Sequence, residues 1–201
     1  MNSKIVVIAA MCAAMIACGG ENRSGQPETD TTGSVQSVQQ TDTASATTTG
    51  VNGGLSTAMS NEDKEFVVKA AMGGMAEVAH GNLAVQKAAH ADVKAFGQRM
   101  VTDHGAANAE LAQLATTKGL ALPTELSGEH QKMQEHLSSL SGAEFDKEYM
   151  KHMVEDHEKT VADFDKASTT ATDADLKAWA AKTLPTLQDH LRQAKETAGK
   201  L

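Results

Sequence analysis

The spacing of apolar residues from about residue 60 onward constrains the fold of this chain most. In three stretches of the chain, a mostly apolar set of residues recurs every three or four positions, which is the period of one face of an α-helix. Aromatic residues make up only 3% of the chain, and Ala, Leu, Val and Met supply most of the apolar surface. Small apolar side chains at this frequency favour closely packed helices over a sheet. The three stripes are Val93, Phe96, Met100, His104, Ala107, Leu111 and Leu114; Phe145, Tyr149, Met153, His157, Thr160 and Phe164; and Leu176, Ala180, Leu184, Leu187, Leu191 and Ala194.

Capping patterns mark where the helices begin. A hydroxyl stands three residues before a carboxylate at Ser60 and Asp63, at Ser141 and Glu144, and at Thr172 and Asp175. In a capping box such a pair satisfies free N–H groups of the first turn. These signals predict helices over 61–89, 92–118, 142–169 and 173–198, with a shorter helix near 125–139.

The connections between these helices predict how they are arranged. Two tight hairpins joined by one long crossover are the connectivity of ferritin-like bundles. About 140 residues are also close to the usual size of one domain. The sequence therefore predicts an all-α domain over 59–199, a ferritin-like four-helix bundle whose long crossover carries a short extra helix.

The first 18 residues predict export and a lipid anchor. Lys4 precedes an apolar run of 13 residues, Ile5 to Ala17, which is too short to span a bilayer and is typical of a signal peptide. Residues 15–19, Met-Ile-Ala-Cys-Gly, resemble the lipobox of bacterial lipoproteins, with Cys18 as the lipidated residue. The alternative is ordinary secretion, with Cys18 unmodified. With Cys18 as the lipidated residue, residues 1–17 are the predicted signal peptide. Retention in the inner membrane uses an Asp directly after this cysteine, and Gly19 stands there instead. We therefore expect the anchor to lie in the outer membrane, facing the periplasm.

Residues 18–58 are predicted to connect Cys18 to the bundle as a disordered tether. Gly, Ser, Thr and Gln fill 25 of the 40 positions from 19 to 58. A segment of this composition buries too little apolar surface to offset the entropy lost on ordering.

Charge and cysteine content exclude several functions. The net charge is −8 and the basic residues are scattered among acidic ones, so we expect no nucleic-acid-binding surface. The one expected contact with a membrane is the N-terminal lipid. Both cysteines, Cys12 and Cys18, precede the predicted bundle. Disulfide and thiol chemistry are therefore excluded there.

Three segments of the chain resemble bacterial domain-of-unknown-function family 4142. They are Val93 to His104, Ser141 to Met150 with Asp156 and His157, and Lys182 to Leu191; the resemblance covers about 62–196. It implies a ferritin-like bundle in exported, outer-membrane proteins, and it brings no established substrate or reaction.

Four residues on or beside the inward stripes are candidate metal ligands: Glu77, His104, His157 and His190. A ferritin-like di-iron site needs two Glu-x-x-His motifs, and Glu77 to His80 is the only one in the chain. We therefore expect no di-iron oxidase. Counting 1.5 Å per residue from the turns puts Glu77, His104 and His157 at one height and His190 about 7 Å away.

The function stays open between two classes. In the first, the histidines are core residues hydrogen-bonded to carboxylates, and the chain is a non-catalytic binding or stress-related module of the envelope. In the second, they hold a transition metal in a metal-binding or redox bundle, with Met100 and Met153 suited to Cu(I). A hydrolase is disfavoured because no nucleophile and base stand at a recognisable spacing.

Overall fold

The computed structural model describes residues 59–201, and the predictions for 1–17, Cys18 and 18–58 lie outside the described residues. Within this range the chain forms helices and no strand, so the all-α prediction is confirmed. The helix bounds lie within three residues of those predicted from sequence. The five helices are α1 (Asn61–Lys87), α2 (Ala91–Thr117), α3 (Gly128–Ser139), α4 (Gly142–Thr170) and α5 (Ala174–Ala198).

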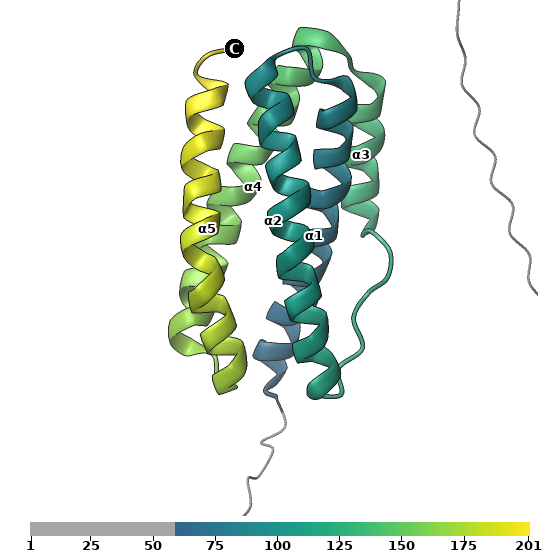
Figure 1. Ribbon diagram of the computed structural model, residues 1–201. Helices are drawn as coiled ribbons and strands as arrows, with labels where there is room; N and C mark the ends of the chain where they lie inside the picture. Colours follow the sequence, from purple (N-terminus) through teal and green to yellow (C-terminus); the bar gives the residue numbers. More distant parts are fainter. Residues whose placement is uncertain (1–58) are drawn as a thin grey trace, which may run out of the picture. The chain divides into compact units, whose positions relative to one another are not determined.

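The helices follow the predicted ferritin-like path (Figure 1). α1 and α2 form one antiparallel hairpin, and α4 and α5 form the other. The α1–α2 turn lies at one end of the bundle and the α4–α5 turn at the opposite end, because the crossover runs back along the bundle and carries α3 beside α1. Among residues 59–201, no helix is both long enough and apolar enough to cross a membrane.

The apolar core is divided into two clusters by a layer of buried polar residues. One cluster, around Phe164, Leu176 and Trp179, lies toward the α4–α5 turn. The other, around Phe96 and Tyr149, lies toward the α1–α2 turn. In α2, α4 and α5 one buried polar residue lies between the parts of the helix that contribute to the two clusters, and in α1 both Glu77 and His80 do. Glu77 and the three histidines of the other helices lie at the centre. These residues, the polar layer, are Glu77, His104, His157 and His190.

None of the three predicted capping boxes forms in full, because the Asp63 carboxylate accepts hydrogen bonds from Thr172 and Asp173 and the other two predicted hydroxyls make no cap hydrogen bond. The Ser60 hydroxyl does accept a hydrogen bond from the Asp63 N–H, as predicted. At α5, however, the cap is Asp173, whose carboxylate accepts from the backbone N–H groups of residues 175 and 176. Ser141 makes no side-chain cap bond, because Gly142 has a positive φ of 59° that turns the chain before the first turn of α4.

A pair of buried carboxylates joins each hairpin to the turn of the other. Asp63, at the start of α1, accepts hydrogen bonds from the Thr172 hydroxyl (2.6 Å) and from the backbone N–H of Asp173 (2.9 Å), both at the α4–α5 turn. Asp146, at the start of α4, accepts from the N–H groups of Ala89 (3.1 Å) and His90 (2.8 Å) at the α1–α2 turn. We call these two residues the turn clamps.

Two glycines bring the backbones of α1 and α2 into contact. A Cβ added to Gly97 would lie 2.6 Å from the Cβ of Ala84 and 2.9 Å from the carbonyl oxygen of Gly81. Real Cβ atoms do not approach that closely, so a side chain at Gly97 would force the helices apart. The first hairpin is therefore packed through its backbone.

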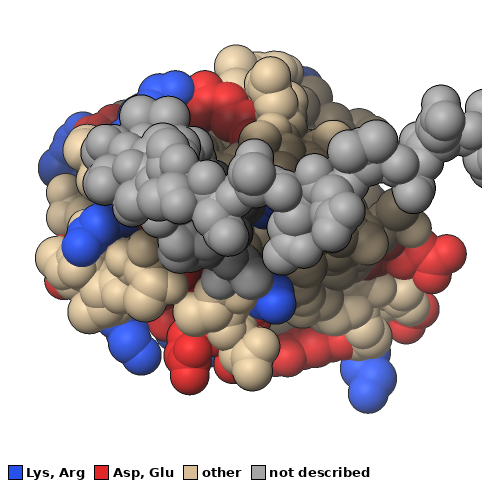
Figure 2. Space-filling view, turned by 90° about the horizontal axis from the view of Figure 1, so that it is seen from below, with Lys and Arg blue, Asp and Glu red and all other residues tan. Residues whose placement is uncertain are grey.

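The end of the bundle at the α4–α5 turn shows both charge signs. On the part of this face that the structure describes, both basic and acidic side chains are present among uncharged ones (Figure 2). Such a mixture is typical of a solvated surface.

Candidate metal centre

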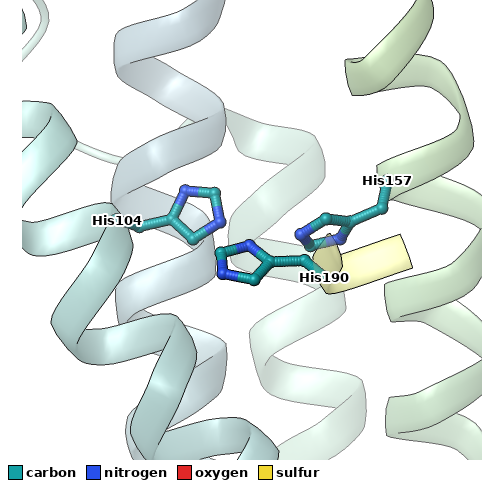
Figure 3. Close-up of side chains that lie close together, drawn as sticks. All are labelled: His104, His157 and His190. Carbon is teal, nitrogen blue, oxygen red and sulfur yellow. The ribbon is translucent and has the colours of Figure 1, made fainter. Parts of the chain in front are cut away.

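Three histidines from three helices turn their rings toward one another inside the bundle (Figure 3). His104 comes from α2, His157 from α4 and His190 from α5. Their ring centroids are 5.7 Å (104–157), 5.4 Å (104–190) and 5.5 Å (157–190) apart. The residues are 7%, 1% and 1% exposed. One ring nitrogen from each lies within 4.8 Å of the other two, which makes this histidine triad a candidate metal centre.

The expected offset of His190 is wrong, and the direction of side chains explains why. In an α-helix each Cα–Cβ bond tilts toward the N-terminus of its helix. His157 precedes the α4–α5 turn and so leans away from it, whereas His190 follows the turn and leans back toward it. The two tilts bring the rings together although the residue count along the helices separates the two positions.

The hydrogen bonds of His157 fix which of its nitrogens is free. Its Nδ1 lies 3.0 Å from the carbonyl oxygen of Met153. A carbonyl only accepts, so the ring proton sits on Nδ1 and the lone pair is on Nε2.

The same reasoning applies to His190 with the nitrogens exchanged. Its Nε2 lies 2.8 Å from a carboxylate oxygen of Asp103, so Nε2 carries the proton and Nδ1 carries the lone pair. Such partners orient metal-binding histidines and raise their basicity. Arg99 in turn donates to Asp103 (3.1 Å) and to Asp189 (2.6 Å).

The nitrogens left free are those that face the centre of the histidine triad. Among residues 59–201, the buried side-chain atoms without a hydrogen-bond partner include His104 Nε2, His157 Nε2 and His190 Nδ1. Burial, followed by the neighbouring histidines, lowers the pKa of His104 from 6.5 to about 3. Burial and His190 lower the pKa of His157 to about 4. Burial also lowers the pKa of His190. The three imidazoles are therefore neutral at neutral pH, and each then has one nitrogen lone pair that a metal ion can use.

Glu77 lies beside the histidine triad and belongs to a second group. Its Oε1 is 3.8 Å from His157 Nδ1, too far for a hydrogen bond. Burial and the nearby Asp156 raise the pKa of Glu77 well above its usual value. Burial opposes ionisation of Asp156 as well, but a hydrogen bond from Glu77 and the adjacent His157 hold its pKa below the usual value. Of the two carboxyls, Glu77 therefore holds a proton more readily than Asp156, and the Glu77, Asp156 and His157 group is a second candidate cluster.

The two sides of the histidine triad differ in character. Toward the α1–α2 turn, Phe96 closes it, with ring centroids 6.3 Å from His157 and 6.4 Å from His190. On the other side lies a cavity of about 310 Å³ whose wall includes His104 and Glu77. A metal held by the three nitrogens would therefore have one open side, toward the cavity.

The sequence did not single out His80 as a core residue. Its side chain is fully buried, and its Nε2 lies 3.3 Å from the carbonyl oxygen of His130 on α3. Burial and the neighbouring His152 lower its pKa to about 4. His80 lies one helical turn after Glu77 on α1, but its hydrogen-bond partner, the carbonyl group of His130, belongs to the crossover and not to a bundle helix.

Comparisons with known proteins agree with this fold. A family model described as a domain of unknown function, DUF4142, matches residues 51–197. No curated protein matches the sequence. The chain is similar in structure to a DUF305 fragment from Deinococcus radiodurans, with 14% identity over 71% of this chain and 99% of that one and a TM-score of 0.63. It is also similar to CopM in the Cu(II)-bound form, with 16% identity over 69% of this chain and 96% of that one and a TM-score of 0.59.

Proposed function

We propose that this chain, which belongs to the DUF4142 family of unknown function, binds one transition-metal ion at the histidine triad. The observation that carries the proposal is the set of three buried nitrogens that face one point and lack a protein partner. Each buried polar atom left unpaired costs about 1–3 kcal/mol. An ion at that point would satisfy all three at once.

The donor set suits borderline metal ions. Neutral imidazoles bind Zn, Cu, Ni and Fe. Two nitrogens on one tetrahedral Zn(II), each at 2.0–2.1 Å, are about 3.4 Å apart, so small side-chain rotations would close the triad around an ion. CopM, which has the same fold, is described in a Cu(II)-bound form, and this makes Cu(II) the first ion to test and Zn(II) the second. The proposal is a binding function, with no reaction assigned.

The test is a titration of the purified, metal-free protein with Cu(II) and, separately, Zn(II). We expect one ion to bind per chain and to stabilise the fold by about 2.7 kcal/mol when free metal reaches a hundredfold excess over the dissociation constant. Thermal unfolding followed by circular dichroism measures this stabilisation. Isothermal titration calorimetry gives the stoichiometry.

Two substitutions remove a ligand and keep its supporting hydrogen bond. In His157→Asn the amide can still donate to the carbonyl of Met153, and in His190→Gln the amide can still donate to Asp103. Both should abolish the stabilisation, while His136→Ala, which removes a half-exposed histidine, should retain it. An equal metal effect in all of these variants would assign binding to surface groups and contradict the proposal. If no ion binds, the histidines are polar core residues.

We also propose that the protein is held at the outer membrane, facing the periplasm, by a lipid on Cys18. The lipobox-like residues 15–19 support this proposal. Cells grown with a labelled fatty acid should give a labelled protein, and Cys18→Ala should abolish the label, with Cys12→Ala as the matched control that retains it. Label on the Cys18→Ala protein would contradict the anchor.

A further inference from the structure

The cavity beside the histidine triad extends along the bundle, and all four bundle helices line it. At one end its wall contains Glu77 and His104, and at the other it contains Phe66, Phe164 and Trp179. Phe66 and Glu77 are eleven residues apart on α1, or about 16 Å along the helix axis. We call this space the elongated cavity. Its volume of about 310 Å³ is at the lower limit for small-molecule sites.

The far end of the elongated cavity is aromatic. The ring centroids of Phe66 and Phe164 are 5.0 Å apart, and those of Phe164 and Trp179 are 5.3 Å apart. Such a group of rings offers a large apolar surface to a ligand.

The wall contains four residues with buried polar atoms that lack a protein partner, and besides His104 and His130 two of them can contact a ligand in the cavity. One atom is Oε2 of Glu77, whose residue is 3% exposed, and the other is the indole Nε1 of Trp179, whose residue is 8% exposed. A carboxyl oxygen accepts a hydrogen bond and the indole N–H donates one. Asp163 lines the same cavity and is paired there with Lys69 (2.5 Å), whereas Asp156, beside Glu77, has no lysine or arginine partner within the described part of the chain. The charge of Asp156 therefore disfavours an anionic ligand at the end near the histidine triad.

We propose that the elongated cavity binds a small, uncharged, elongated molecule with an apolar body and a hydroxyl group at one end. The apolar body contacts Phe66, Phe164 and Trp179, and the hydroxyl hydrogen-bonds to Glu77 at the end near the histidine triad. This site uses cavity atoms that the metal does not need. It therefore stands or fails separately from the proposed metal function.

The probe is 4-butylphenol, added to the full chain in the presence of a chelator so that metal plays no part. Trp179 is the only tryptophan, and it lines the cavity, so its fluorescence reports occupancy. We expect saturable binding of 4-butylphenol. Butylbenzene, which lacks the hydroxyl, should bind about tenfold more weakly, the effect of one hydrogen bond. The 4-butylbenzoate anion should not bind.

Gly73 offers a substitution that fills the cavity. It lines the cavity, and a Cβ added there meets no atom within 4 Å, so Gly73→Leu extends into free space without a clash at its first carbon. Gly105→Leu, at a position on α2 that is equally free of neighbours, is the matched control. Circular dichroism verifies that both variants fold. Binding should be lost in the first variant and kept in the second.

Three results would overturn the inference. The first is no saturable binding of 4-butylphenol to the wild-type chain. The second is equal affinity for 4-butylphenol and butylbenzene, which would show that the hydroxyl is not recognised. The third is unchanged binding in folded Gly73→Leu, which would place the ligand elsewhere.

Discussion

Lowering the pH from about 7.5 to about 5 should destabilise the metal-free bundle by several kcal/mol. The cause is a set of histidines that are buried without charge. Burial is the first cause that lowers the pKa of His80 and of His157 to about 4 and that of His104 to about 3. In the unfolded chain a histidine titrates near pH 6.5.

The sign follows from which state binds protons first. Above pH 6.5 these histidines are neutral in both states and have no effect. As the pH falls from 6.5 toward 4, the unfolded chain takes up protons that the folded chain cannot, and this favours unfolding by about 2 kcal/mol per histidine at pH 5. Glu77 acts in the opposite direction, because its raised pKa lets the folded state hold a proton that the unfolded state releases. It offsets part of the loss.

Urea unfolding at the two pH values measures the effect. His104→Leu removes one titrating group, so its free energy of unfolding should change less with pH than that of the wild type, by about 2 kcal/mol. Equal stability of the wild-type protein at both pH values would show that the buried histidines do not resist protonation.

Asp63→Ala should destabilise the bundle by about 3 kcal/mol or more. The substitution removes the acceptor for the Thr172 hydroxyl and for the backbone N–H groups of Thr172 and Asp173. Each buried polar group left unpaired costs about 1–3 kcal/mol. Asp146→Ala should act in the same direction at the other end, because it frees the N–H groups of Ala89 and His90.

Urea unfolding at neutral pH gives these free energies from the midpoint and slope of the transition. The matched control is Glu110→Ala, which removes an exposed carboxylate paired with Lys182 and should leave stability almost unchanged. A loss in Asp63→Ala no larger than in this control would mean that water replaces the turn clamp.

Local patterns were sufficient to predict the helices but not the contacts that join them. The stripes from Val93 to Leu114 and from Leu176 to Ala194 gave helix length and buried face, because apolar periodicity is a property of one segment. Asp63 was interpreted as the partner of Ser60, three residues away. Its other partner, Thr172, is 109 residues distant, and such a pairing leaves no local signal.

The histidine triad was partly predictable. His104, His157 and His190 stood on or beside inward stripes, so their burial could be expected. Counting residues from the turns predicted that His190 lies about 7 Å from the other two histidines along the bundle. That prediction failed because the count ignores the opposite tilt of side chains on antiparallel helices. Asp103 accepts the hydrogen bond from His190 because α2 and α5 lie close together. The spacing of apolar residues within one helix gives no information on the distance between two helices.

The backbone contact at Gly81 and Gly97 determines which parts of the bundle can move. Interiors packed this closely resist separation, so α1 and α2 should move as one rigid body. Access to the polar layer then passes along the α1–α4 edge, where the exposed side chains of Lys69 and Asp163 pair beside the elongated cavity. Because a turn clamp joins the two hairpins at each end of the bundle, a ligand should enter between the clamps by rearrangement of this exposed pair, without separation of the hairpins.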